Sequence, residues 1–122
     1  MLEKREVMTI TVCKSKIHRA TITDRSIDYV GSLTIDEDLM KRADLVEYEK
    51  IQVANISNGN RFETYVIKGE AGSGTIALNG AAARLGEKGD LVIIIAYGEI
   101  DKEDGPGFKP AVVHVDKNNK PV

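Results

Sequence analysis

Short runs of apolar and β-branched residues recur along the chain, each four to eight residues long and separated by polar residues. Runs of this length and composition are typical of strands rather than helices. They occupy residues 8–12, 16–23, 32–35, 50–56, 61–67, 74–78, 90–97 and 111–115. The run DLVIIIAY at 90–97 is almost continuously apolar, which predicts a strand buried on both faces, as in the centre of a barrel.

The connections between these runs contain residues that favour turns. Asn58-Gly59 lies between two alternating runs and predicts a β-hairpin. The glycine-rich stretch GEAGSG at 69–74 predicts a hairpin loop, and the stretch EDGPGFKP at 103–110 predicts a longer loop. The last residues, 116–122, predict a loosely held tail.

Two stretches have the pattern of short helices. In residues 36–46, Asp36 can act as the N-cap, acidic residues fill the first turn, and apolar residues follow at helical spacing. In residues 79–86, Asn79 or Gly80 can open a turn of alanines that ends at a glycine.

Together these elements predict a mainly β fold in which the strands form a small closed barrel with short helices over its ends. An open sheet of this many strands would leave exposed edges, which favours closure. With 122 residues the chain is expected to be one domain, 1–122, and a chain of this size buries roughly two-thirds of its unfolded surface.

Composition excludes several classes of partner. The formal net charge is -2, aromatic residues make up 5%, and tryptophan is absent, so we expect neither nucleic acid nor an acidic membrane surface as a partner. A single cysteine, Cys13, fits a reducing compartment and is interpreted as a small buried apolar residue. No apolar run approaches the roughly 20 residues of a membrane span, and no secretory signal pattern follows the N-terminus, so a cytoplasmic location is expected.

The sequence lacks the usual metal and phosphate motifs. His18 and His114 are far apart with no zinc-binding spacing, so no metal is expected, and His114 is interpreted as a packed strand residue.

In DYVGSLTID, residues 28–36, the Gly31-Ser32 pair interrupts two strand-like runs. It has two interpretations: a turn, or a serine that attacks the carbonyl before it. Composition does not favour the second, because Gly72-Ser73 is another such pair.

Other polar residues within the strand-like runs also have purely structural interpretations. Lys16 can lie on a solvated strand face, Tyr29 and Tyr65 can be half-buried aromatics, and Asn79 can be a helix cap.

The order and spacing of five segments make the chain resemble the aspartate 1-decarboxylase family, whose members depend on a pyruvoyl group. These segments are KSKIHRATIT at 14–23, YVGSLTIDEDL at 29–39, NGNRFETYVIKGEAGSG at 58–74, LNGAAARL at 78–85 and GDLVIII at 89–95. The resemblance covers roughly residues 8 to 116. It implies a six-stranded double-psi β-barrel and a homotetramer with active sites at subunit interfaces.

The resemblance also gives the Gly31-Ser32 pair a role. It implies that the Ser32 oxygen adds to the preceding carbonyl, and that the chain then cleaves into residues 1–31 and 32–122. Ser32 becomes a covalent pyruvoyl group, with Thr64 stabilising the oxyanion of the cleavage step. The resemblance further implies that the pyruvoyl carbonyl forms a Schiff base with the substrate amine and accepts the electrons released on decarboxylation.

The remaining roles implied by the resemblance concern the substrate, L-aspartate, which becomes β-alanine for pantothenate and coenzyme A synthesis. Arg61 has a planar fork suited to a carboxylate, Lys16 adds positive charge, and Tyr65 is the proton donor. The other residues that it implies line the site or contact the substrate: His18, Tyr29, Asn79, Gly80, Ala81 and Ala82.

Two positions depart from the family's pattern, and two alternatives remain open. Ala54 stands where some relatives carry Trp, and Asp44 stands where relatives commonly have Gly at the end of a helix. The chain could instead be a non-enzymatic small β-barrel that binds a partner, because one fold hosts many functions. It could also be a self-processing relative that acts on a different amino acid.

Overall fold

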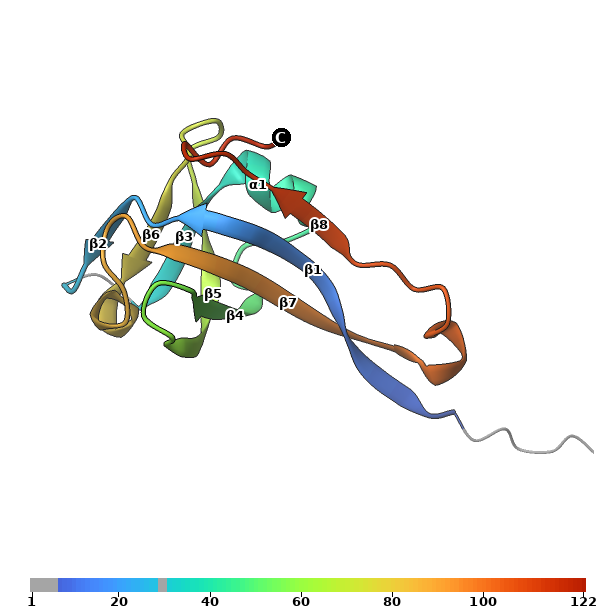
Figure 1. Ribbon diagram of the computed structural model, residues 1–122. Coiled ribbons are helices and arrows are strands. Elements are labelled where there is room, and N and C mark those ends of the chain that lie inside the picture. The colour runs from blue at the N-terminus through green and yellow to red at the C-terminus, as the bar shows by residue number, and fades with distance from the viewer. Residues whose placement is uncertain (1–6, 29–30) are drawn as a thin grey trace, which may run out of the picture.

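The computed structural model describes residues 7–28 and 31–122, and it is built mainly of strands. Two long strands, β1 and β7, run antiparallel to each other (Figure 1). The strands are β1 (Thr9–Thr21), β2 (Asp24–Ser26), β3 (Ser32–Asp36), β4 (Lys50–Asn55), β5 (Arg61–Gly69), β6 (Ile76–Asn79), β7 (Leu91–Asp101) and β8 (Ala111–His114). The helices are α1 (Glu37–Arg42) and the 3₁₀ turns η1 (Gly80–Arg84) and η2 (Lys102–Asp104).

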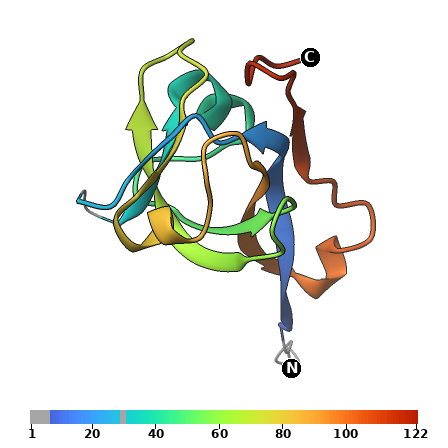
Figure 2. The same ribbon diagram turned by 60° about the vertical axis from the view of Figure 1, so that its left-hand side comes forward.

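The strands form one eight-stranded sheet in the order β2-β6-β3-β5-β4-β7-β1-β8. Figure 2 shows most of these strands curving around the middle of the molecule, with β8 at the edge. The prediction of a mainly β fold with short helices is confirmed. Closure into a six-stranded barrel is not confirmed, because β2 and β8, the ends of the sheet, are not paired with each other within the described residues.

Several predicted strands and connections differ from the observed ones. Residues 8–12 and 16–23 were expected to be separate strands, but β1 runs through both, with irregular pairing between Cys13 and Ser15 and between Ile17 and Ala20. Bulges of this kind let one long strand bend without ending. β2 and η2 were not predicted at all.

The hairpin predicted at Asn58-Gly59 is confirmed, because β4 and β5 pair antiparallel on either side of it. The hairpin predicted at residues 69–74 is wrong. β5 and β6 do not pair with each other; both pair with β3, which lies between them. This loop therefore crosses over one end of β3. Glycine residues cannot distinguish a crossing from a hairpin, because both need tight turns.

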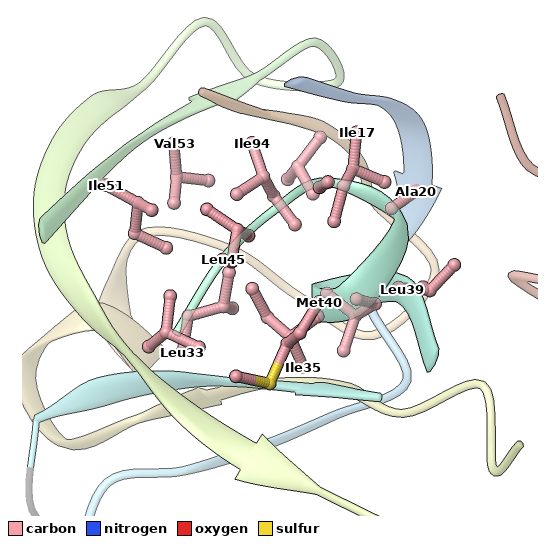
Figure 3. Close-up of a cluster of buried hydrophobic side chains, with 14 of the residues drawn as sticks. Ile17, Ala20, Leu33, Ile35, Leu39, Met40, Leu45, Ile51, Val53 and Ile94 are labelled. Carbon is pink, nitrogen blue, oxygen red and sulfur yellow. The ribbon is translucent and has the colours of Figure 1, made fainter. Parts of the chain in front are cut away.

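Among the described residues, apolar side chains from every strand except β2, together with those of α1, meet in one core. Figure 3 shows part of it, including Ile17, Leu33, Val53 and Ile94. Along the start of β7, fully buried residues alternate with half-buried ones. Residues 90–97 were predicted to be buried on both faces. In the single chain one face of this strand is fully buried and the other is partly exposed.

The helix predicted over residues 36–46 is shorter than expected, ending at Arg42. Asp44 follows it with φ of 54°, so this aspartate takes the left-handed conformation in which glycine is common. Asp36 caps the helix as predicted. Its carboxylate accepts a hydrogen bond from the Asp38 N–H at 2.8 Å.

Asp36 also holds the loop that follows β5. It is only 2% exposed, and its carboxylate accepts further hydrogen bonds from the N–H groups of Gly72 and Gly74, at 2.9 Å and 2.8 Å. Burial alone would raise the pKa of this carboxyl. The three backbone donors, from Gly74, Asp38 and Gly72, together with the charge of Lys120, outweigh burial and lower the pKa.

We predict that Asp36→Asn lowers the free energy of unfolding by about 2–4 kcal/mol at pH 7, because a charged acceptor of three hydrogen bonds is lost. A lowered folded-state pKa gives stability that is present above pH about 4 and is lost as pH falls through that pKa. The gap between wild type and Asp36→Asn should therefore narrow on acidification. Urea unfolding at one protein concentration and several pH values measures both effects.

Asp38→Asn is the matched control, because Asp38 is an exposed acid in the first turn of the same helix. It should cost at most about 1 kcal/mol. Equal losses from Asp36→Asn and Asp38→Asn, with the same pH dependence, would contradict this role of Asp36.

The C-terminal segment is not a loosely held tail, so that prediction is wrong. Asn119 is 1% exposed, and its side chain hydrogen-bonds to both backbone groups of Thr21 and to the carbonyl of Gly74 at 2.7–2.8 Å. The backbone N–H of Val122 donates to the His114 carbonyl at 2.9 Å. These contacts fasten residues 116–122 to the end of β1, to the loop at Gly74 and to the end of β8.

Candidate active site

Ser32 begins β3 and is 1% exposed. Its Cα partner across the antiparallel β3–β6 pair is Asn79. Directly opposed residues of such a pair place their side chains on the same face. The Asn79 Nδ2 accordingly donates to the Ser32 Oγ at 3.0 Å and to the Thr34 Oγ1 at 2.9 Å. Two of the predicted site residues are therefore in direct contact.

Asn79 is the N-cap residue of η1, as predicted, but its side chain forms no cap hydrogen bond to this turn. Its amide instead bridges two hydroxyls of β3. Thr34 was missed in the sequence, although it lies two residues after Ser32 and therefore on the same face of the strand. The helical turn predicted near residues 79–86 is the short 3₁₀ turn η1.

The first residues of η1 lie beside the Gly31-Ser32 link. A Cβ added to Gly31 would lie 3.9 Å from the backbone N of Ala81 and 4.0 Å from the Asn79 carbonyl oxygen. Gly80, with φ of 60°, turns the chain at this point. The structure thus brings the predicted segment of Gly80, Ala81 and Ala82 next to the predicted cleavage point.

β5 runs parallel to β3, with Leu33 opposite Val66. Continuing this register by one residue sets Ser32 level with Tyr65, and by two sets Gly31 level with Thr64. Alternation along β5 places Tyr65 on the outer face and Thr64 on the inner face that Val66 shares with the core. Both side chains are half-buried.

The Tyr65 ring lies against the ring of Tyr48, with centroids 6.3 Å apart and ring planes inclined by 44°. Tyr48 belongs to the loop between α1 and β4. Tyr48 was not among the predicted site residues, and the residues around it in the sequence give no signal for such a role.

Arg61 starts β5 on the same face as Tyr65, four residues earlier, and it is exposed. Its Nη2 donates to the Gln52 Oε1 at 3.1 Å, and the Tyr97 hydroxyl donates to the same oxygen at 2.9 Å. Gln52 therefore orients the guanidinium and leaves much of it facing solvent. This contact was also missed; alternation along β4 and β5 would have placed both residues on one face.

Lys16 and His18 lie on β1, four places from β3 in the order of strands. Lys16 is half-buried, with Ile95 and Val112 as its Cα partners. Within residues 7–28 and 31–122, neither Lys16 nor His18 forms a hydrogen bond with Tyr65 or Asn79.

The His18 ring meets the His114 ring edge to face, with centroids 5.5 Å apart. Its Nδ1 is buried without a hydrogen-bond partner. Burial, followed by the charges of Lys16, His114 and Arg19, lowers the pKa of His18, so that its neutral form predominates at pH 7. His114 itself is exposed on β8, so its interpretation as a packed strand residue holds only through this ring contact.

Tyr29 lies outside the described residues, so its place in the site stays a prediction. Within the part of the chain that the structure describes, no three His, Cys, Asp or Glu side chains gather as metal ligands. No helix there is long and apolar enough to cross a membrane. Cys13 is half-buried, and its thiol donates to the Ser15 carbonyl at 3.6 Å.

The geometry brings together the buried Ser32 hydroxyl and the Asn79 amide that donates to it. The carbonyl of Gly31, the preceding residue, lies on the other side of the peptide bond to Ser32. A hydroxyl placed next to a carbonyl, with N–H donors nearby, can support addition of oxygen to carbon and stabilise the resulting charge. The Tyr65 phenol and the Arg61 guanidinium lie on the outer face of the neighbouring strand, β5. Such groups can donate a proton to a substrate and bind its carboxylate.

Comparisons with known proteins agree on one family. The family model described as aspartate decarboxylase matches residues 8–122. An aspartate 1-decarboxylase from Acetivibrio thermocellus is 66% identical over 113 residues, which cover 93% of this chain and 90% of that protein. Another from Leptospira biflexa is 60% identical over 115 residues, covering 93% and 98% respectively.

Among solved structures, the computationally designed msDPBB_sym2 protein matches with a TM-score of 0.44 and 14% identity. The match covers 73% of this chain and 99% of that one.

Proposed function

The chain belongs to the aspartate decarboxylase family, and on this basis we propose that it cleaves itself at Gly31-Ser32 and then converts L-aspartate to β-alanine and CO₂. The β-alanine would serve pantothenate and coenzyme A synthesis. The observation that carries the proposal is the buried Ser32 Oγ held at 3.0 Å by the Asn79 amide, directly after the exposed Gly31.

Cleavage begins when the Ser32 Oγ adds to the Gly31 carbonyl carbon and the C–N bond breaks, turning the amide into an ester. Loss of the Ser32 Cα proton and of the Cβ–O bond then releases Gly31 as a carboxylate and leaves dehydroalanine at position 32. One water hydrolyses the dehydroalanine, releasing ammonia and leaving a pyruvoyl group. The products are residues 1–31 and 32–122.

Three groups support these steps. The Asn79 amide holds the hydroxyl in place, and the backbone N of Ala81 lies near the Gly31 position. Thr64, level with Gly31 by the strand register, is assigned to the oxyanion. Loss of one such donor typically slows a reaction by about 10²- to 10³-fold.

The site also fits a carbonyl group at position 32. Ser32 is almost fully covered, and the Asn79 N–H that donates to its hydroxyl can donate equally to a carbonyl oxygen there. When present, a pyruvoyl group supplies an electrophilic carbonyl that condenses with the substrate amine and accepts the electrons left at Cα by decarboxylation.

The chain's own residues then bind and protonate the substrate. Arg61 is assigned to a carboxylate of L-aspartate, because its fork is oriented by Gln52 and exposed. Lys16 is assigned to supply additional positive charge near the substrate. His18 and Tyr29 are assigned to line the site. Tyr65, level with Ser32 by the register, is assigned as the proton donor at Cα.

The finer features of the assembly belong to the same proposal. We expect a closed six-stranded double-psi barrel in a cytoplasmic homotetramer, with active sites at the subunit interfaces. The half-buried apolar face of β7, which includes Ile93 and Ile95, supports a second chain packing on it. A second subunit could bring Lys16 and His18 to the Ser32 site of its neighbour.

Intact-mass analysis of the purified protein, with an assay for β-alanine, tests this function. We expect two fragments that meet at Gly31-Ser32, and turnover of L-aspartate in preference to glutamate and other amino acids. A single uncut chain after prolonged warming, with no β-alanine, would favour the non-enzymatic binding module. Cleaved protein that prefers another amino acid would contradict the substrate assignment alone.

A further inference from the structure

Tyr48 has an unusual backbone conformation for its residue type. Its φ is 72°, and its side chain is 69% exposed. Bulky L residues rarely take this left-handed conformation, because the Cβ crowds the neighbouring carbonyl. Conformations of this kind persist where the surrounding structure holds them, and they are frequent at functional sites.

Backbone hydrogen bonds hold Tyr48 next to β5. The Tyr48 N–H donates to the Val66 carbonyl at 2.8 Å, and the Val66 N–H donates to the Glu49 carbonyl at 3.0 Å. Val66 follows Tyr65 directly, so the backbones of the two tyrosines are fixed relative to each other. The rings then meet at 6.3 Å.

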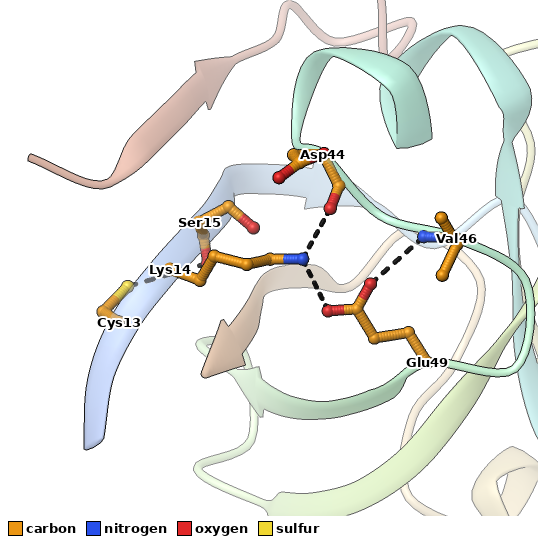
Figure 4. Close-up of polar contacts among 6 residues, drawn as sticks. All are labelled: Cys13, Lys14, Ser15, Asp44, Val46 and Glu49. Carbon is orange, nitrogen blue, oxygen red and sulfur yellow. Dashed lines mark hydrogen bonds and ion pairs between the residues drawn. The ribbon is translucent and has the colours of Figure 1, made fainter. Parts of the chain in front are cut away.

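A second set of contacts anchors the same loop to β1 (Figure 4). The Lys14 Nζ donates to the Asp44 carbonyl and to the Glu49 carboxylate, both at 2.6 Å. The other carboxylate oxygen of Glu49 accepts from the Val46 N–H at 3.1 Å. These contacts bind the loop at both ends, with Tyr48 between them.

The loop therefore keeps an exposed aromatic ring against the one phenol to which we assign proton donation. A half-buried Tyr65 on an outer sheet face could otherwise swing about its side-chain torsions. Packing by a second ring restricts that motion and keeps the hydroxyl on one path.

We propose that Tyr48 is a positioning residue, whose ring holds the Tyr65 ring so that its hydroxyl reaches the carbon that loses the carboxylate. This inference rests on the proposed function. It adds a residue that acts through Tyr65, and it gives a reason for the left-handed conformation of the loop.

Two variants test the role of the ring. Tyr48→Asn removes it and inserts a residue that tolerates a left-handed conformation, so the thermal midpoint should be equal to or higher than that of wild type. We expect self-cleavage to remain complete, kcat per cleaved chain to fall about 3- to 10-fold, and KM to stay unchanged. Tyr48→Phe keeps the ring and should retain the wild-type kcat.

A third comparison shows whether Tyr48 acts through Tyr65. In a Tyr65→Phe background, which lacks the phenol hydroxyl, adding Tyr48→Asn should lower kcat no further. Three results would each overturn the inference. The first is a wild-type kcat in Tyr48→Asn, and the second is a kcat loss in Tyr48→Phe as large as that in Tyr48→Asn. The third is a kcat loss on adding Tyr48→Asn to Tyr65→Phe that is as large as the loss on adding it to wild type. Failure of wild type to cleave or to form β-alanine would instead refute the proposed function.

Discussion

Ser32→Ala is expected to yield a folded chain that stays uncut and forms no β-alanine. Without the Oγ, no atom at position 32 can add to the Gly31 carbonyl, and the carbonyl that activates the substrate amine cannot form. The loss should be complete, equivalent to about 10⁶-fold or more, because the remaining protein lacks the group that supplies the chemistry. Intact mass and β-alanine release measure the two effects.

The fold should tolerate this change. Removing the Ser32 hydroxyl deprives the Asn79 amide of one acceptor, but the Thr34 hydroxyl remains bonded to it at 2.9 Å. Loss of the bond between Asn79 and Ser32 costs about 1 kcal/mol.

The chain contains its own control in the second Gly-Ser pair, Gly72-Ser73. The Ser73 hydroxyl lies in an exposed loop and donates to the Glu70 carbonyl at 2.6 Å. Ser73→Ala should cleave and turn over like wild type. Activity in Ser32→Ala would refute the origin of the cofactor, and loss of cleavage in Ser73→Ala would show that the position of cleavage has been misassigned.

Tyr65→Phe is expected to separate self-cleavage from decarboxylation. The phenol is assigned to proton donation, so cleavage should proceed while kcat falls by about 10²- to 10⁴-fold. The ring remains, so its contact with Tyr48 and the stability of β5 should be preserved.

Tyr97→Phe is the matched control for kcat, because it removes a phenol from the same outer face. The Tyr97 hydroxyl donates to Gln52, two strands away from Ser32 in the order of the sheet. We expect its kcat to remain close to wild type. If Tyr65→Phe kept wild-type kcat, or if Tyr97→Phe lost as much, Tyr65 would not be the proton donor.

Much of the fold could be predicted from sequence because its signals are local. Strand-forming runs, the Asn58-Gly59 turn and the Asp36 cap each depend on neighbouring residues. The crossing at residues 69–74 and the fastening of the tail by Asn119 depend on contacts between distant segments. A single sequence does not reveal those pairings.

The site shows the same division. The resemblance identified Ser32 and Asn79, but their direct contact follows from the β3–β6 register, which local patterns do not specify. Tyr48 was missed because its proposed role depends on a backbone angle and on a ring from another segment. Lys16 and His18 lie on a distant strand of the sheet, and a second subunit is proposed to account for them.

The most direct measurement is trapping of the substrate on the cleaved protein. Reduction with borohydride in the presence of L-aspartate should attach a substrate-derived adduct to the first residue of the fragment 32–122. The adduct should be absent from residues 1–31 and from Ser32→Ala. A cleaved and active protein that yields no adduct on the larger fragment would contradict a catalytic carbonyl derived from Ser32.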